Sequence, residues 1–393
     1  MTRPRIDTAE RRRRIAVRHH VAPACRSSDP VAVAGDIVGI HASDPGSVYL
    51  GLLARVPDLT VEAVGHALYE ERSLLKVLGM RRTMFVTPVD AAGVIQSACT
   101  GAIAGRERQR LLQMLEGAGI TKDPEGWLAD VEAKTVAALG ELGEATAADL
   151  TKRVPGLRKQ ISFGEGKKWQ GKVGVSTRLL FLLASEGRII RARPKGSWVS
   201  SLYRWAPMDG WVVGGLPKPP TGEAQTELVG RWLAAFGPGT LKDIQWWTGW
   251  TVAETKRALA AAGAVEVELD EGPGWAAAGD TDDTPDPGPW VALLPALDTT
   301  TMGWQARDWF LGEHGLRLFD RNGNAGPTVW VDGRVVGGWA HHGDGSVVYR
   351  LFDDVGAEAT AAIEGEAERI RKWLADVRIV PRFRTPTEVE LSA

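Results

Sequence analysis

The sequence predicts an α+β fold in which tandem winged helix-turn-helix units are followed by a C-terminal β-rich domain. Two observations lead to this prediction. First, helical segments followed by a turn-rich hairpin occur in residues 105–208 and again in 209–282, and such repetition is typical of a tandem array. Second, the pattern changes to short strands in 283–393, after the linker-like stretch GDTDDTPDPGP. At roughly 150 residues per domain the 393 residues suit two or three domains, and we assign 1–104 to an N-terminal winged-helix-like unit.

The N-terminal unit is predicted to be mostly helical. Asp29 and Asp44 each precede a proline, which is the pattern of an N-cap followed by proline at the first helical position. Thr60 is a third predicted cap, because TVEAVGHALYEE after it carries an apolar stripe at helical spacing. The segment LLKVLGMRRTMFVTP then favours strands that end at Pro88.

The second unit is predicted from two short helices and a basic hairpin. TAADLTKRV is the first helix, and VSTRLLFLLASEGRI is the second, with Ser176 as its expected cap. GRIIRARPKGSWVSSLYRWAP then indicates two strands around a basic turn at RPKGS.

The third unit repeats the pattern with an acidic hairpin. We expect helices near 225–235, 240–247 and 251–261, and then a hairpin whose turn is DEGPG. Its acidic residues, Glu266, Asp270 and Glu271, argue against phosphate contact at this tip and favour a protein-interaction role for this unit.

The C-terminal domain is predicted to contain a small sheet and a long helix. TVWVDGRVVGGWA has the pattern of a hairpin with a two-residue turn at Asp332 and Gly333, and SVVYRLF continues the sheet. AEATAAIEGEAERIRKWLADV has the spacing of an amphipathic helix.

The net charge of −2 conceals a strongly uneven distribution of charge. Residues 151–205 hold thirteen Lys or Arg against Glu165 and Glu186, whereas 264–286 holds eight Asp or Glu and no basic residue. A concentrated basic segment suits a polyanion such as DNA, because Lys and Arg supply most phosphate contacts. A solvated basic face without a partner is the alternative, and charge alone does not decide between them.

Cysteine content and hydropathy indicate the compartment. Cys25 and Cys99 are too few for a disulfide framework, which favours a reducing cytoplasm. The stretch VAVAGDIVGI is interrupted by Gly35 and Asp36, and no segment reaches the roughly 20 apolar residues of a membrane span. We therefore expect a cytoplasmic monomer with no membrane partner.

The segment LRKQISFGEGKKWQGKVG is predicted to be a flexible basic loop. GKKWQGKV resembles a phosphate-binding loop, but Val173 stands where Ser or Thr would hold the metal, and no apolar strand precedes it. Aromatic residues among cations suit contact with phosphates and bases, although a surface loop without a role remains the alternative. The residues predicted to bind DNA in this unit are Arg158, Lys159, Lys167, Lys168, Trp169, Lys172, Arg178, Arg193 and Lys195.

No metal site is predicted. The adjacent pairs His19-His20 and His341-His342 would point their side chains apart, and neither has Cys, Asp or Glu at zinc-ligand spacing.

His41-Ala42-Ser43 bridges two predicted helices. In an extended bridge the first and third side chains face the same side, so an imidazole and a hydroxyl would be presented together. The alternative is that they satisfy free backbone groups at the helix ends, and the pattern alone favours that reading.

A resemblance to a known family favours a catalytic role for His41 and Ser43 over the capping of helix ends. GIHASDPGSVYLGLLAR and RSLLKVLGMRRTMFV resemble segments of the AlkZ/YcaQ-like winged-helix family of DNA glycosylases, as do GTLKDIQWWTGWT, LLPALD and PTVWVDGRVVGGW. The resemblance covers about residues 10–375. It implies three tandem winged helices that form a concave scaffold, completed by a C-terminal β domain, and excision of bulky alkylated purines from DNA. Some relatives confer resistance to a DNA-damaging natural product.

The resemblance also identifies the candidate catalytic residues. The family motif has two glutamines separated by one apolar residue, at the positions of His41 and Ser43, so this sequence keeps the spacing and loses both glutamines. Phe85 is a second departure, because relatives often carry histidine there, whereas Arg81 is retained and is expected to lie beside the pair at the DNA. We expect His41 to activate water, Ser43 to orient it and Asp44 to stabilise the sugar cation or the imidazolium.

The resulting hypothesis is a monofunctional DNA glycosylase that acts on N3- or N7-alkylated purines without metal or cofactor. The expected partner is double-stranded, damaged DNA. Two other functions stay open at this point: a non-catalytic winged-helix DNA-binding protein such as a regulator or damage sensor, and a protein-interaction scaffold.

Overall fold

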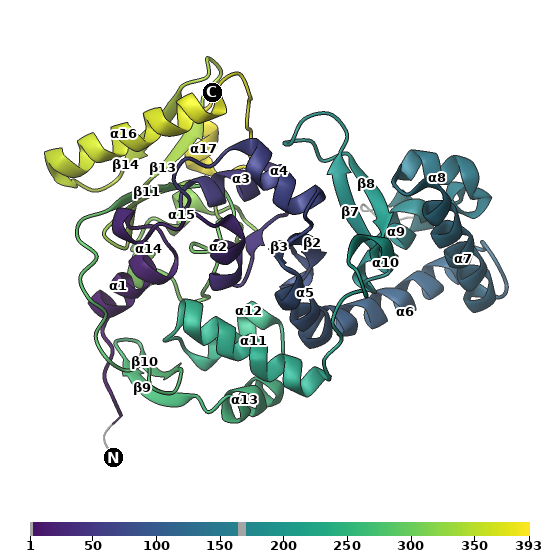
Figure 1. The fold of residues 1–393 in the computed structure, drawn as a ribbon, viewed down its shortest axis with the longest axis horizontal. Coiled ribbons are helices and arrows are strands. Elements are labelled where there is room, and N and C mark those ends of the chain that lie inside the picture. Colours follow the sequence, from purple (N-terminus) through teal and green to yellow (C-terminus); the bar gives the residue numbers. More distant parts are fainter. Residues whose placement is uncertain (1–2, 164–169) are drawn as a thin grey trace. The chain divides into compact units, whose positions relative to one another are not determined.

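A computed structural model describes residues 3–163 and 170–393 (Figure 1). By the packing of its Cα trace the chain forms two compact units. The first comprises Met1–Val64, Phe85–Pro88 and Gln225–Ala393, and the second comprises Gly65–Met84 and Val89–Ala224. Each unit therefore contains segments that are far apart in the sequence.

The chain begins with short helices capped by side chains. In order, these elements are α1 (Thr8–Arg18), the 3-10 turn η1 (Pro23–Cys25), α2 (Pro30–Asp36), β1 (Ile40–His41), α3 (Pro45–Leu53) and α4 (Val61–Tyr69). Asp29 caps α2 and Asp44 caps α3, each by accepting a backbone N–H, and Thr60 caps α4 by accepting from the N–H of Ala63. The three predicted caps are confirmed. β2 (Leu74–Leu78), the turn η2 (Met80–Arg82) and β3 (Met84–Pro88) follow, and β1 pairs antiparallel with β3.

The second unit is built around a helical core and a three-stranded sheet. Its first helices are α5 (Val89–Ile95), the π-helical turn η3 (Gln96–Thr100), α6 (Gly101–Gly117) and α7 (Pro124–Leu142). The next elements are β4 (Ala145–Thr146), α8 (Ala147–Arg153), η4 (Pro155–Arg158), β5 (Gln160–Phe163), β6 (Gly171–Gly174) and α9 (Val175–Ser185). β7 (Ile189–Pro194), β8 (Tyr203–Pro207) and α10 (Met208–Trp211) complete it, and the sheet order is β4-β8-β7. Leu139, Leu150, Leu179 and Leu183 are fully buried between these helices and the sheet.

Two details of this unit differ from the predictions. The segment 157–174 contains the antiparallel hairpin β5–β6 rather than only a flexible loop, because Ile161 is buried in the core and anchors the first strand. The N-cap of α9 is Gly174 rather than Ser176, since the helix already begins at Val175. The predicted DNA-binding residues Lys167, Lys168 and Trp169 lie outside the described residues.

Apart from η4 and the β5–β6 pair, the third region of the chain repeats the order of helices and hairpin seen from α7 to β8. It runs through α11 (Thr221–Phe236), α12 (Leu241–Thr248), α13 (Val252–Ala261), β9 (Val265–Leu269) and β10 (Gly272–Ala276). Gly239 pairs with Trp275 of β10 in the way that Ala145 of β4 pairs with Trp205 of β8. The helices and the hairpin predicted here are thus present.

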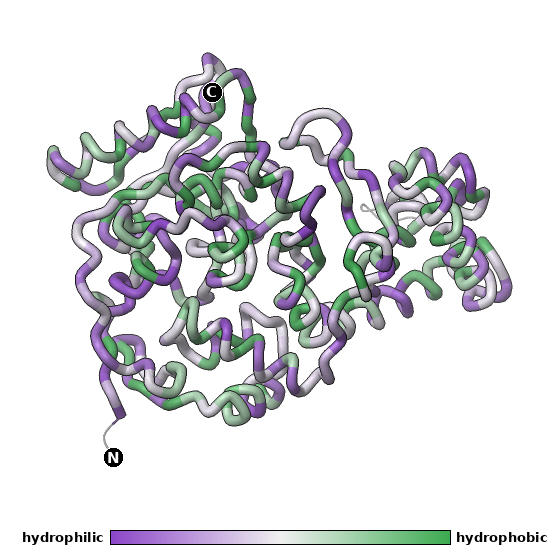
Figure 2. Tube along the Cα trace, viewed as in Figure 1, coloured by the Kyte–Doolittle hydropathy of each residue, from purple (hydrophilic) through white to green (hydrophobic). Residues whose placement is uncertain are grey.

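The C-terminal region is a four-stranded antiparallel sheet with helices packed on it. The sheet order is β11 (Val291–Leu294), β12 (Thr328–Val331), β13 (Arg334–His341) and β14 (Val347–Leu351). The helices are α14 (Asp308–Leu311), α15 (Gly315–Leu318), α16 (Gly356–Leu374) and α17 (Pro386–Leu391). The turn at Asp332-Gly333 is confirmed, and both residues have positive φ, as a two-residue hairpin turn requires. Hydrophobic and hydrophilic residues alternate along α16 in Figure 2, and its buried face includes Ile363 and Ile370.

Candidate active site

The bridge between α2 and α3 is a two-residue strand followed by a helix cap. His41 lies opposite Phe85 in the β1–β3 pair, and Ala42 is fully buried. Gly39 makes the turn into β1 with a φ of +103°, and a Cβ atom there would lie 3.3 Å from the carbonyl oxygen of Val86. The path of residues 39–44 is therefore set by the backbone on both sides of the bridge.

His41 is held through its backbone and its ring. Its N–H donates to Thr299 Oγ1 at 3.0 Å, and the same hydroxyl donates to the carbonyl of Gly39 at 2.9 Å. The imidazole lies 5.3 Å from the ring of Phe85, at an interplanar angle of 59°. His41 is only 4% exposed, whereas Ser43 is half-buried, so Ser43 is the member of the pair that reaches the surface more.

Each carboxylate oxygen of Asp44 accepts a hydrogen bond from a backbone N–H group. Oδ1 accepts from the N–H of Gly46 at 3.0 Å, and Oδ2 accepts from the N–H of Arg382 at 2.7 Å. With 6% exposure, this side chain joins α3 to the C-terminal segment. Both oxygens thus already serve the fold, and contact of Asp44 with a sugar cation stays a prediction.

The segment 295–300 clamps α3 from the other side. Ser47 donates to the carbonyl of Ala296 at 2.7 Å. Arg55 forms a bidentate ion pair with Asp298, with N–O distances of 2.9 and 2.8 Å, and also donates to Thr300 Oγ1 at 2.8 Å. All of these groups are buried. The sequence patterns alone assign no role to Arg55 or Asp298, although both residues lie in segments that carry the family resemblance, GLLAR and LLPALD.

Arg81 lies in the turn between β2 and β3 with a φ of +52°. Burial lowers the pKa of its guanidinium to about 10. A non-glycine residue in this conformation costs free energy and is more frequent at functional positions than elsewhere. That Arg81 lies beside His41 at the DNA stays a prediction.

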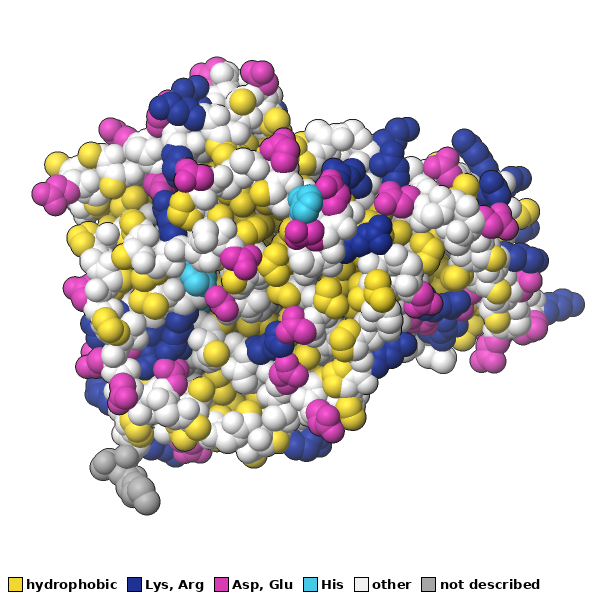
Figure 3. All heavy atoms as spheres, viewed as in Figure 1, with side chains coloured by type: hydrophobic (Ala, Val, Ile, Leu, Met, Phe, Trp, Pro, Cys, Tyr) yellow, Lys and Arg dark blue, Asp and Glu magenta, His cyan; other side chains and the backbone are white. Residues whose placement is uncertain are grey.

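The described residues predicted to bind DNA differ in how free their side chains are. Lys159, Lys172 and Lys195 are exposed. Arg158 donates to the carbonyls of Thr151 and Lys152 at the end of α8, and Arg193 forms an exposed ion pair with Glu70, whereas Arg178 is half-buried on α9. Figure 3 shows many Lys and Arg side chains over the part of the molecule that carries α7 and α8. The exposed lysines are thus the residues that can meet a phosphate without giving up an existing hydrogen bond.

The acidic hairpin β9–β10 has a partner within the chain. Arg3 pairs with Glu266, Arg5 with Asp270 and Arg11 with Glu271, all from the N-terminal arm and α1. Asp280 also pairs with Arg14 and Arg18. The protein-interaction role expected for these acidic residues is therefore not needed to explain them.

Among the described residues, no group of three or more His, Cys, Asp or Glu side chains is arranged to hold a metal ion. In the same part of the chain, the structure contains no helix with the length and apolar character needed to cross a membrane.

Comparison with protein families identifies a defined class for this chain, the DNA glycosylases related to AlkZ. The chain belongs to this family: the model for DNA glycosylase AlkZ-like proteins matches residues 34–373. The DNA glycosylase AlkZ of Streptomyces sahachiroi has a similar structure, with a TM-score of 0.71 and 20% sequence identity over 94% of this chain and 97% of that one. A comparison with curated proteins finds no match.

Proposed function

We propose that this protein hydrolyses the N-glycosidic bond of bulky N3- or N7-alkylated purines in double-stranded DNA. The reaction is monofunctional: it releases the altered base and leaves an abasic site. A role in resistance to a DNA-alkylating natural product fits this substrate class. The proposal is supported by the resemblance, which puts His41 and Ser43 at the positions of the family's catalytic pair, and it is carried by the observation that Thr299 and Asp44 hold the backbone of this bridge in place.

The chemistry needs a base for water more than an acid for the leaving group. An N3- or N7-alkylated purine carries a positive charge, so the electron pair of the C1′–N bond passes to the base, which leaves as a neutral molecule. Water adds to the resulting sugar cation at C1′, and its proton passes to the imidazole of His41. A positioned base of this kind is typically worth about 10²–10⁴-fold in rate.

Two departures from the family pattern face each other in the structure. His41 replaces a glutamine on β1, and Phe85 stands where relatives often carry histidine on β3. The two residues are direct partners in the strand pair, and their rings are 5.3 Å apart. We infer that this protein carries its site histidine on β1, at position 41, and not on β3 as relatives often do. An imidazole is then available in the site although both glutamines are absent.

Ser43 and Asp44 have supporting tasks in this proposal. Ser43, which is half-buried, orients the attacking water. Asp44 acts as a positioning residue, because its hydrogen bonds to the N–H groups of Gly46 and Arg382 fix the start of α3 and hence the bridge that carries His41.

We also infer that the repeated units are winged helices that bind duplex DNA. In each, a helix, two further helices and a hairpin follow one another, and the segment after the first helix (β4 in one unit, Gly239 in the other) pairs with the last strand of the hairpin; the β5–β6 pair is an addition within the first of the two. The unit from α7 to β8 carries the exposed Lys159, Lys172 and Lys195, which suit phosphate contacts.

A non-catalytic DNA-binding protein is the second candidate function. The burial of His41 favours it, because a ring that is 4% exposed must become accessible to water before it can act as a base. In this alternative His41 and Phe85 form an apolar strand contact, and the protein recognises damage without removing it.

The experiment that separates the two functions uses a duplex with a single N7-alkylguanine. The duplex is incubated with the protein and then treated with alkali, which cleaves the strand at abasic sites. The proposed function predicts cleavage at the lesion that depends on the protein and is absent from the undamaged duplex. Tight binding of the lesion duplex without any abasic product would establish the non-catalytic alternative.

A further inference from the structure

Lys76 is a buried lysine without an acidic partner. It lies on β2 and is only 6% exposed, yet within the described residues it makes no hydrogen bond and no ion pair. Its contact is with an aromatic ring: the ammonium lies 5.0 Å from the centroid of Tyr203. Lysine is seldom buried unless a carboxylate or a hydrogen-bond acceptor compensates its charge.

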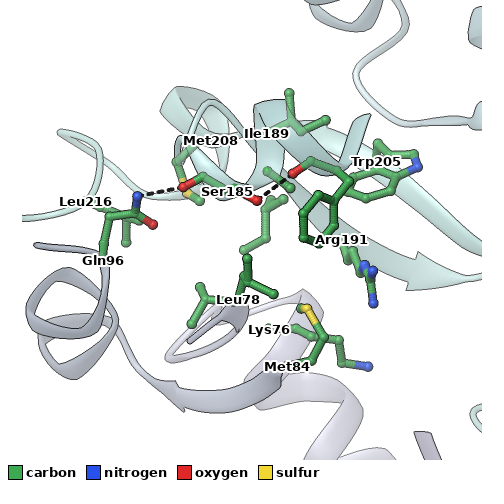
Figure 4. A pocket seen from close by; sticks show the side chains of 14 residues that line it. Lys76, Leu78, Met84, Gln96, Ser185, Ile189, Arg191, Trp205, Met208 and Leu216 are labelled. Atoms are coloured by element: carbon green, nitrogen blue, oxygen red, sulfur yellow. Dashed lines mark hydrogen bonds between the residues drawn. The ribbon is translucent and has the colours of Figure 1, made fainter. Parts of the chain in front are cut away.

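A second cation lies over the same ring. The guanidinium carbon of Arg191, on β7, is 4.9 Å from the centroid of Tyr203 and 5.6 Å from that of Trp205. Figure 4 shows the side chains of Lys76 and Arg191 extending toward the same edge of a pocket that is otherwise mostly apolar. Two positive charges thus lie close to one aromatic ring, where the β7–β8 strand pair runs toward its turn.

Burial of the Lys76 ammonium beside a guanidinium is unfavourable unless an anion lies close to the lysine. Burial, and then repulsion by Arg191, lower the pKa of Lys76 to about 7. The ring of Tyr203 stabilises a cation only weakly, which offsets part of the cost of desolvation. Leucine or methionine would fill the same position without that cost, so a bound anion gives the lysine a function that an apolar residue cannot supply.

We infer that Lys76 and Arg191 form a binding site for a phosphate group of the DNA backbone, with Tyr203 as its floor. Arg191, Arg193 and Lys195 are the less buried residues of this part of the strand and its turn, and they alternate with the buried Ala192 and Pro194, so the site continues a row of cations. A backbone phosphate supplies the negative charge that Lys76 lacks, and a guanidinium together with an ammonium is a common pair of phosphate ligands. The inference rests on the proposed DNA-binding role but not on catalysis.

The site links DNA binding to proton uptake. Near neutral pH the free protein holds Lys76 partly neutral, and a bound phosphate stabilises the ammonium form, so binding takes up a proton. Arg191 is the charged group that acts on Lys76, and it keeps its charge over the whole pH range used in experiments. Gln96 and Ser185, which also line the pocket, are neutral, and Tyr203 is the other titratable group in contact with the ammonium.

The first test measures affinity for an undamaged duplex at pH 6.5 and pH 8.5 at constant ionic strength, for the parent, Lys76→Met and Lys76→Arg. We expect the parent to bind about tenfold more weakly at pH 8.5, because Lys76 must then gain a proton on binding. Lys76→Met should bind weakly at both pH values, and Lys76→Arg should bind well at both. The same pH dependence in all three proteins would overturn the inference, since it would arise from other groups.

The second test uses only the parent and so does not depend on how the variants fold. A lysine with a pKa near 7 reacts readily with acetic anhydride at pH 7.5, and mass spectrometry reports the acetylation of Lys76 against that of the exposed Lys134. Selective protection of Lys76 by duplex DNA supports the inference. Protection by inorganic phosphate but not by DNA would show a site for free phosphate, and no protection by either would show that Lys76 binds no phosphate; both results overturn it.

The glycosylase activity and the phosphate site at Lys76 can be disproved independently of each other. A protein that excises no alkylpurine but shows binding dependent on Lys76 has the phosphate site without the proposed chemistry. A protein that excises the base while Lys76→Met binds DNA like the parent at both pH values has the chemistry without this site.

Discussion

His19 shows how one buried side chain joins three segments of the first unit. Its Nδ1 accepts from the hydroxyl of Thr300 at 2.7 Å, and its Nε2–H donates to the carbonyl of Ala235 at 3.0 Å. Thr300 in turn accepts from Arg55, which is paired with Asp298. The neutral imidazole therefore belongs to the same network that clamps α3 and, through it, the bridge at 39–44.

The charge state of His19 sets an expected dependence of stability on pH. Burial, and then the charge of Arg55, lower the pKa of His19 to about 3, from about 6.5 in the unfolded chain. The unfolded state therefore binds the proton first, so the stability is full above pH 6.5 and falls as the pH drops toward 3. The contribution of this one group is up to about 1.4 kcal/mol per pH unit.

We expect His19→Gln to flatten the fall in the free energy of unfolding between pH 6.5 and pH 5, as measured by chemical denaturation. His66→Gln, which changes an exposed histidine on α4, is the matched control and should leave the slope as in the parent. If His19→Gln and the parent lose stability with the same slope, His19 is not held neutral in the native state.

The helix caps explain why part of the fold follows from short sequence patterns. Thr146 with Asp149 and Thr240 with Asp243 form capping boxes at equivalent places in the two repeated regions, directly after the short strand. Asp44 has the equivalent place after β1. A cap depends on residues within one turn of helix, so the sequence alone is enough to predict it.

The hairpin β5–β6 shows what local patterns miss. Its strands contain four residues each, and its sequence is rich in glycine and lysine, which disfavour strands. What fixes it is burial of Ile161 beside Val175 and Leu157 in the core of the second unit. Such packing depends on tertiary structure, and hydrophobic periodicity in a short segment carries no sign of it.

The basic hairpin segment leads to a prediction about salt dependence. Changing Lys167, Lys168 and Lys172 together to glutamine should reduce the slope of log affinity for duplex DNA against log salt concentration. The expected reduction is about 0.9 for each phosphate that the variant no longer neutralises. Filter binding or fluorescence anisotropy at several salt concentrations measures that slope.

Lys242 and Lys256, which are exposed on α12 and α13, provide the control. Their change to glutamine removes positive charge from the region with the acidic hairpin and should leave the slope nearly unchanged. An unchanged slope in the triple variant would mean that the 157–174 segment does not contact DNA.

At the level of the whole chain, the acidic segment 264–286 is paired within the protein, whereas the basic segment 151–205 keeps exposed lysines. The acidic residues of 264–286 are largely matched by arginines of the N-terminal arm and α1. In the basic segment, Lys159, Lys172 and Lys195 stay exposed. The net charge of −2 thus hides a surface with cations available for a polyanion.

The candidate site was only partly predictable from the sequence. The spacing of His41, Ser43 and Asp44 was visible, and the cap at Asp44 followed from the proline after it. The hydrogen bond from Arg382 to Asp44, the pairing of Arg55 with Asp298 and the contact of Lys76 with the ring of Tyr203 join residues 127 or more positions apart. Local sequence patterns carry no sign of such pairs, because the pairs are formed by tertiary packing.

The central claim is that His41 is the base that activates water. The most direct test compares single-turnover excision of N7-alkylguanine by the parent, His41→Ala and the control His66→Ala, with DNA affinity measured for each. The account predicts that His41→Ala loses about 10²-fold or more in rate and the limb of the pH profile that reports the imidazole, with affinity near that of the parent. Ser43→Ala should lose less, because a second water can replace a hydroxyl. Excision by His41→Ala at the rate of the parent would contradict the account.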